Sequence, residues 1–135
     1  MIYIKVMVGG LCESGIQTFK KGNIMDSKAE LARTKDRSRA LVKAVNAPMK
    51  GFGQLSAAVK SSDALSVREK EYVAMGIAVV QGCDDCVGYH ADLLQKLGCT
   101  RADYCDVLAM AIQMGGGPAV MNAGRALEIW DDLAA

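Results

Sequence analysis

The sequence has 135 residues, of which 51% are hydrophobic and 23% charged, and its formal net charge at pH 7 is +1. This near-neutral balance gives no electrostatic basis for binding nucleic acid or an anionic membrane surface. The most apolar stretch, residues 73–80, is far shorter than the roughly 18 residues that a membrane span needs. We therefore expect a soluble protein with one hydrophobic core, whose partners are small molecules or other proteins.

Residues 1–24 differ from the rest of the chain. A short β-branched run is followed by Gly-rich and Lys-rich sequence without helical periodicity. Lys5 interrupts the apolar run, and no convincing cleavage site follows Gly9 and Gly10, which argues against a signal peptide. We predict that residues 1–24 form a loosely attached extension outside the fold, and that residues 25–135 form a single domain.

The remaining pattern predicts an all-α fold of five or six helices and no sheet. The helices are expected at 27–45 (opened by a capping box of Ser27 and Glu30), 48–60, 70–81 (after a capping box of Ser66 and Glu69), 83–97, 100–114 and 118–130. Gly82, Gly98 and the run Gly115-Gly116-Gly117-Pro118 separate the later helices. Segments 70–81 and 100–114 are apolar on nearly every side, so we expect both to be largely buried.

The cysteines indicate the compartment and one candidate site. Five cysteines are an odd number, and only Cys83 and Cys86 stand at a motif spacing. A secreted disulfide framework is therefore not indicated, and we expect a cytoplasmic protein. On a helix, Cys86 lies about 60° from Cys83, and His90 about 40° beyond Cys86. All three face the same way, and the helix N-terminus favours a thiolate, most directly at Cys83.

A dithiol that cycles between reduced and oxidised forms also needs groups that move protons. His90, the single histidine of the chain, stands one helical turn after Cys86. Glu71 falls early in an apolar helix, where an unpaired carboxylate would be costly, although an exposed position in the first turn is an equally good interpretation. If the helices fold back about Gly82, Glu71 and His90 both come beside the sulfurs, and the carboxylate can orient the imidazole.

These residues resemble a known signature. Glu71, Cys83-Asp84-Asp85-Cys86 and His90, with their spacing, are similar to the alkylhydroperoxidase D-like (AhpD-like) branch of the carboxymuconolactone decarboxylase superfamily. The resemblance implies an all-α subunit that assembles as a trimer or hexamer. It also implies a peroxidase or disulfide reductase that acts on a small hydroperoxide or disulfide and is returned to its reduced form by an unknown thiol reductant, without a cofactor.

By the same resemblance, Cys86 is the peroxidatic thiol, Cys83 the proton donor and resolving partner, and Glu71 with His90 the proton relay. The helix-terminus argument instead favours Cys83 as the more acidic thiol, so the two roles stay open. The best-known relatives carry a second histidine where this chain has Asp84 and Asp85. Two carboxylates beside the thiols should raise the thiol pKa values and lower their reactivity.

Three alternatives remain. A decarboxylase-like lyase is one, although that branch typically lacks the dithiol. A metal site is the second, with ligands from Cys83, Cys86 and His90 and a fourth from Glu71, although no further well-spaced cysteine pair supports it. A non-catalytic helical oligomer with buried thiols is the third. In every case so many apolar helices in a small subunit predict association with further copies.

Overall fold

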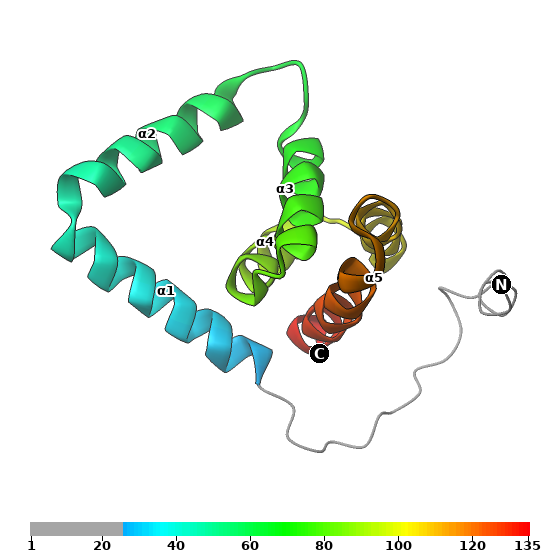
Figure 1. The fold of residues 1–135 in the computed structure, drawn as a ribbon. Helices are drawn as coiled ribbons and strands as arrows, with labels where there is room; N and C mark the ends of the chain where they lie inside the picture. Colours follow the sequence, from blue (N-terminus) through cyan, green and yellow to red (C-terminus); the bar gives the residue numbers. More distant parts are fainter. Residues whose placement is uncertain (1–25) are drawn as a thin grey trace, which may run out of the picture.

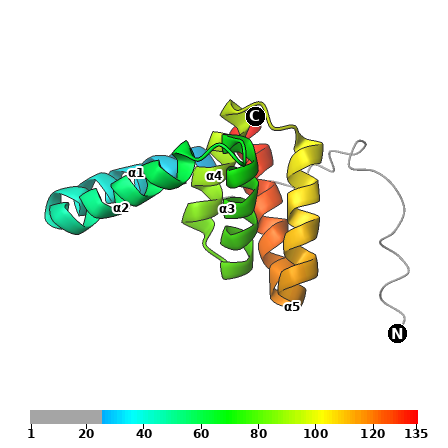
Figure 2. The same cartoon turned by 90° about the horizontal axis from the view of Figure 1, so that it is seen from above.

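The computed structural model describes residues 26–135, and the predicted extension at residues 1–24 lies outside them. The described chain forms five helices and no strand: α1 (Ser27–Ala44), α2 (Asn46–Ser61), α3 (Val67–Gln81), α4 (Asp84–Lys96) and α5 (Arg101–Ala134). The predicted all-α class is confirmed. Figure 1 shows α3, α4 and α5 packed as a body, from which α1 and α2 project as a pair; Figure 2 shows the same pair extending to one side.

The predicted N-terminal cap is correct for α3 but not for α1. Ser66 and Glu69 form the predicted capping box. Thr100 and Asp103 form a second one at the start of α5. The predicted box of Ser27 and Glu30 is wrong, because Asp26 is the N-cap of α1 and its side chain accepts the Ala29 N–H. The Glu30 carboxylate is used instead by the guanidinium groups of Arg33 and Arg37.

The last two predicted helices are joined as α5, with a kink between them. Gly116 has φ 65° and ψ −152°, a conformation inside the helix that glycine alone adopts readily. The chain turns there, and the two halves of α5 fold back on each other, as Figure 2 shows. The predicted break at the glycine run is therefore confirmed as a kink rather than a loop.

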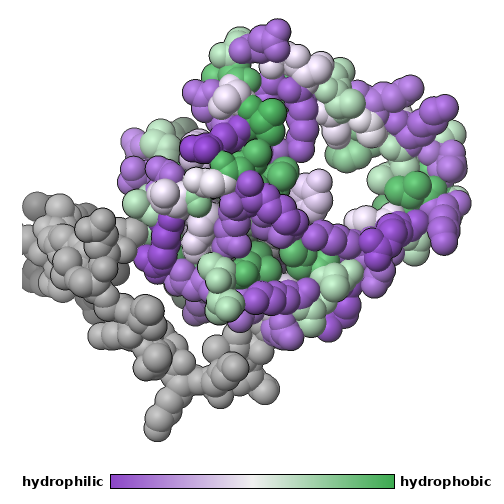
Figure 3. Space-filling model, turned by 180° about the vertical axis from the view of Figure 1, so that it is seen from behind, coloured by the Kyte–Doolittle hydropathy of each residue, from purple (hydrophilic) through white to green (hydrophobic). Residues whose placement is uncertain are grey.

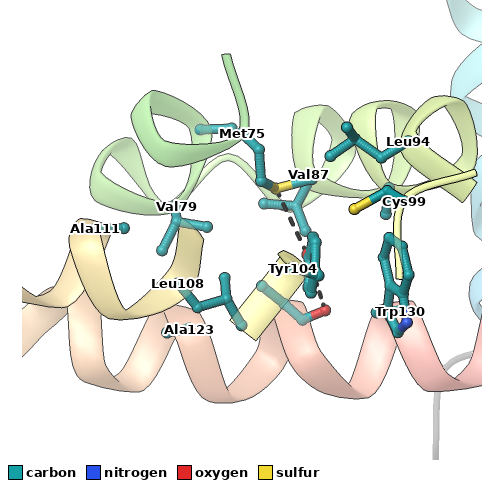
Figure 4. Packing of buried hydrophobic residues seen from close by; sticks show 13 residues of the cluster. Met75, Val79, Val87, Leu94, Cys99, Tyr104, Leu108, Ala111, Ala123 and Trp130 are labelled. Carbon is teal, nitrogen blue, oxygen red and sulfur yellow. Dashed lines mark hydrogen bonds between the residues drawn. The ribbon is translucent and has the colours of Figure 1, made fainter. Parts of the chain in front are cut away.

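The core lies between α3, α4 and both halves of α5. Tyr104 and Trp130 stack with their ring centroids 4.3 Å apart, and the Tyr104 hydroxyl donates to the Ala126 carbonyl. Burial raises the pKa of Tyr104 far above its usual value. Figure 4 shows these rings beside Met75, Leu94 and Leu108, which come from all three helices. This packing fixes the relative positions of α3 and α4.

Segments 70–81 and 100–114 are less buried within the subunit than predicted. Val73 and Ile77 on α3 are 56% and 52% exposed, and Met110 and Met114 on α5 are 57% and 73% exposed. Together with neighbouring side chains they line an apolar groove of about 490 Å³. Only one face of each helix is needed to close the core of three helices, so the second apolar face remains at the surface.

Candidate active site

The turn between α3 and α4 positions the two cysteines of the candidate site. Gly82 ends α3 with φ 67°, in the left-handed region, and a Cβ atom there would lie 3.1 Å from Nδ2 of Asn122. Glycine satisfies both requirements. The next residue, Cys83, is the N-cap of α4, so the predicted reversal at Gly82 is confirmed.

The two sulfurs of the motif are bonded to each other. Cys83 and Cys86 form a disulfide with Cα atoms 5.2 Å apart. The Sγ atom of Cys83 also accepts the backbone N–H of Cys86 at 3.3 Å, so it has the place of a capping oxygen at the start of α4. The predicted proximity of these residues on one helix start is present in the structure.

Glu71 is buried rather than exposed in the first turn of α3, with 1% of its surface accessible. Its Oε2 atom lies 2.6 Å from Nδ1 of His90, and its Oε1 atom lies 2.8 Å from Nζ of Lys60. Of the two sequence interpretations of Glu71, the partnered one is therefore correct. Both carboxylate oxygens have a partner, which is what a buried charge requires.

The charge on Glu71 determines the proton on His90. Burial opposes ionisation, but the hydrogen bonds from Lys60 and His90 outweigh it and hold the pKa of Glu71 below its usual value. An ionised carboxylate only accepts hydrogen bonds, so Nδ1 of His90 carries the hydrogen. In the neutral ring, Nε2 then has a free lone pair. Nε2 is therefore the ring nitrogen that can accept a proton.

The two aspartates between the cysteines face arginines. Asp85 accepts hydrogen bonds from the Thr34 hydroxyl at 2.7 Å and from Nη2 of Arg37 at 2.8 Å. These contacts lower the pKa of Asp85, against a smaller opposing effect of burial. Asp84 lies 3.5 Å from Nε of Arg125. The sulfurs therefore do not face two uncompensated negative charges, which weakens the expected effect of this pair on the thiols.

Sequence reasoning missed Lys60, Thr34, Arg37 and Arg125. They stand on α1, α2 and the second half of α5, and only the tertiary fold brings them to α3 and α4. Arginine and lysine at exposed helical positions normally indicate a solvated surface, so the local pattern held no signal for them.

The alternative interpretation as a metal site gains no support from the residues that the structure describes. Within residues 26–135, no group of three or more His, Cys, Asp or Glu side chains is placed to hold a metal ion. The two sulfurs are instead joined in the disulfide. Among the same residues, no helix is both long and apolar enough to cross a membrane.

Comparison with known proteins identifies the family of this chain. The sequence profile of the carboxymuconolactone decarboxylase family matches residues 46–128. The chain belongs to this family. An uncharacterized protein of Cupriavidus necator is 37% identical over 110 residues, covering 82% of this chain and 97% of the relative. An uncharacterized protein of the cox locus of Paracoccus denitrificans is 29% identical over 82 residues, covering 61% of this chain and 74% of the relative.

Two crystal structures of carboxymuconolactone decarboxylase family proteins have the same fold. An apo structure from Legionella pneumophila has a TM-score of 0.74 at 36% identity and covers 82% of this chain and all of its own. A protein from Thermotoga maritima, for which a part in the antioxidative response has been suggested, has a TM-score of 0.70 at 24% identity, covering 78% and 90% of the two chains. The family match begins at residue 46, so Thr34 and Arg37 on α1 precede it.

Proposed function

We propose that this carboxymuconolactone decarboxylase family protein is a thiol-dependent oxidoreductase that reduces a small hydroperoxide or disulfide. One observation carries the proposal: the Cys83–Cys86 disulfide stands at the start of α4, with His90 one turn after it and hydrogen-bonded to buried Glu71. A redox-active disulfide, a base and a group that orients the base are the parts that dithiol chemistry needs.

The proposed reaction balances without a cofactor. The reduced dithiol and a hydroperoxide yield the disulfide, an alcohol and water; with a disulfide substrate they yield the protein disulfide and two thiols. Two equivalents of an external thiol then return the protein to the dithiol and are themselves oxidised to a disulfide. His90 moves the protons through Nε2, and Glu71 holds the ring in that tautomer. We place this cycle in the cytoplasm, where thiol reductants keep dithiols reduced.

Family membership supports the proposal in its coarse form, since the neighbour from Thermotoga maritima has been connected with an antioxidative response. The alternative lyase activity of the family would leave Cys83 and Cys86 without a role. No observation on the described residues favours that activity over thiol chemistry.

The test is a substrate screen with the reduced protein. Hydrogen peroxide, an alkyl hydroperoxide and a small neutral disulfide are each supplied, and conversion of the dithiol to the disulfide is followed by thiol titration. We expect oxidation at Cys83 and Cys86, and loss of turnover in Cys83→Ser, Cys86→Ser and His90→Ala. Full activity in all three variants, or a dithiol inert to every oxidant, refutes the proposal. Stoichiometric zinc that leaves only with a chelator would support the metal site instead.

We also propose that the chain associates with copies of itself, with α2 of one copy in the apolar groove of another. No residue of α2 is buried, and Phe52, Leu55 and Val59 are 62%, 60% and 55% exposed on one helical face. Figure 3 shows apolar surface on the projecting helices as well as on the body. The stripe 52–59 and the groove walls 73–80 and 107–114 each span about 10 Å at 1.5 Å per residue, so their lengths match.

Sedimentation of the full chain tests this association. We expect wild type to sediment as an oligomer, and Leu55→Asp or Ile77→Asp, which place a charge on either surface, to shift it toward monomer. Ala57→Asp, at an exposed position on the opposite face of the same helix, is the control. A monomeric wild type, or an oligomer unaffected by both aspartates, contradicts the proposal. A monomer whose groove becomes exposed when residues 1–25 are removed would show that this segment covers the groove.

A further inference from the structure

The two sulfurs of the disulfide have different surroundings. Cys83 lies on a surface pocket of about 540 Å³ that is also lined by Glu30, Arg37, Asp84 and Asp85. Both cysteines are partly buried, but Cys86 packs against the hydrophobic core. A molecule that enters this pocket therefore contacts Cys83, and Cys86 is not among the residues that line it.

The start of α4 also stabilises charge on Cys83. Its Sγ atom already accepts the backbone N–H of Cys86 at 3.3 Å. When the disulfide is opened, a thiolate at Cys83 keeps this donor and the positive end of the helix dipole, and a charged sulfur accepts the hydrogen bond more strongly than a neutral one. Cys86 lies inside the first turn and has no such capping position.

Two arginines offset the negative charge of the carboxylates near Cys83. Arg37 on α1 donates to both oxygens of Asp85 and to Glu30, and Arg125 on α5 faces Asp84. These ion pairs are exposed, and each contributes little to stability. Their effect on chemistry is local, because they reduce the repulsion between the carboxylates and a thiolate at Cys83.

We infer that Sγ of Cys83 is the atom that exchanges with external thiols and disulfides, and that Cys86 is the internal thiol that closes the ring. This assignment rests on the proposed function and reverses the roles that the family resemblance implies. It follows from access and capping at the described residues, whereas the resemblance transfers roles by position in the motif.

The steps balance for a disulfide substrate. The Cys83 thiolate attacks one sulfur of the substrate, the substrate S–S bond breaks, and the first thiol leaves with a proton from solvent. Cys86 gives its proton to Nε2 of His90 and attacks Sγ of Cys83. The second substrate thiolate leaves and takes that proton. The protein dithiol is oxidised to the disulfide and the substrate is reduced to two thiols.

Single-cysteine variants distinguish the two assignments. Cys86→Ser and Cys83→Ser are reacted with excess dithiodipyridine, a neutral disulfide, and release of thiopyridone is followed by stopped-flow absorbance. Cys83→Ser/Cys86→Ser provides the background from the other cysteines. We expect Cys86→Ser to react at least about tenfold faster than Cys83→Ser, with the adduct on Cys83 by peptide mass spectrometry.

The other outcomes contradict either the assignment of Cys83 or the proposed function. Equal rates, or a faster reaction of Cys83→Ser, overturn the assignment and leave the proposed function intact. Two single variants that behave like the double variant, together with a wild type that does not cycle, refute the proposed function itself. Wild type is also reduced and treated with substoichiometric iodoacetamide, so that a misfolded variant cannot decide the result. Alkylation of Cys83 before Cys86 is expected there, and the opposite order overturns the assignment.

Discussion

The Nδ1 atom of His90 on α4 lies 2.6 Å from Oε2 of Glu71 on α3, although the residues are 19 positions apart in the sequence. The contact keeps the hydrogen on Nδ1 and the lone pair on Nε2, so the proposed chemistry depends on Glu71 as a positioning residue. Glu71→Gln is expected to lower the rate of dithiol oxidation about 10²-fold, since an amide no longer enforces that tautomer. The measurement is single-turnover oxidation by a small disulfide.

Glu128→Gln is the matched control, because Glu128 is an exposed glutamate of α5 to which the proposed chemistry assigns no role. Its rate should equal that of wild type. An unchanged rate in Glu71→Gln would show that the contact serves folding alone.

Lys60 should set the pH range in which Glu71 is ionised. The pKa of Glu71 is lowered on folding, so its ionisation stabilises the fold above the unfolded pKa, and this contribution is lost as pH falls through the folded pKa. Lys60→Met removes one of the two hydrogen bonds that oppose burial. We expect the acid loss of stability, and the acid limb of activity, to move to higher pH, as measured by urea midpoints and rates across pH.

Lys60→Arg keeps the charge and should restore the wild-type profile, and Lys50→Met, on the same helix, should not alter it. If the Lys60→Met and Lys50→Met profiles coincide, Lys60 has no influence on Glu71.

Arg37 should support the reactivity of Cys83 through Asp85. Arg37→Ala removes the guanidinium from the Asp85 carboxylate beside the pocket, while the Thr34 hydroxyl still donates to it. We expect alkylation of reduced Cys83 to slow by about three- to tenfold at low salt and less at high salt, because ions screen the exposed carboxylate. The rate is measured with iodoacetamide.

Arg37→Ala/Asp85→Asn removes both charges and should recover the rate. Arg39→Ala, which breaks an exposed pair with Asp36 on α1, is the control. Equal slowing in Arg37→Ala and the double variant would mean that Arg37 acts by shape rather than by charge.

Gly116 should be intolerant of a side chain for backbone reasons alone. A Cβ atom there would meet nothing within 4 Å, yet φ is 65° and ψ is −152°. Gly116→Ala is expected to lower the free energy of unfolding by about 1–3 kcal/mol, measured by urea denaturation. Gly117→Ala, which also has open space but no positive φ, should cost far less or stabilise. Equal stability of the two variants would contradict the conformational argument.

Trp130 anchors the end of α5 in the core. It is 4% exposed and stacks on Tyr104. Trp130→Ala is expected to cost about 3–5 kcal/mol of the free energy of unfolding, and Trp130→Phe clearly less, because phenylalanine keeps part of the packing. Urea unfolding monitored by circular dichroism checks both. A small loss in Trp130→Ala would show that the ring contributes little beyond the rest of the core.

Local sequence signals were enough to predict the helices of the body and the two cysteines together at one helix start. Capping boxes, Gly82 and Gly98 are local signals, because each depends on hydrogen bonds or dihedral angles within a few residues. The proximity of Cys83 and Cys86 followed equally from helical spacing. The burial of Glu71 remained ambiguous, since a glutamate at this position of the helix fits both an exposed first turn and a buried site with a charged partner.

The partners that surround these groups depend on how the helices pack against each other. Lys60 reaches Glu71 from α2, and Arg37 reaches Asp85 from α1. Such contacts depend on the angles between whole helices, which no local pattern specifies. The same reason explains the exposed faces of α3 and α5: hydrophobic periodicity shows that a face is apolar, but only packing shows whether the same subunit covers it.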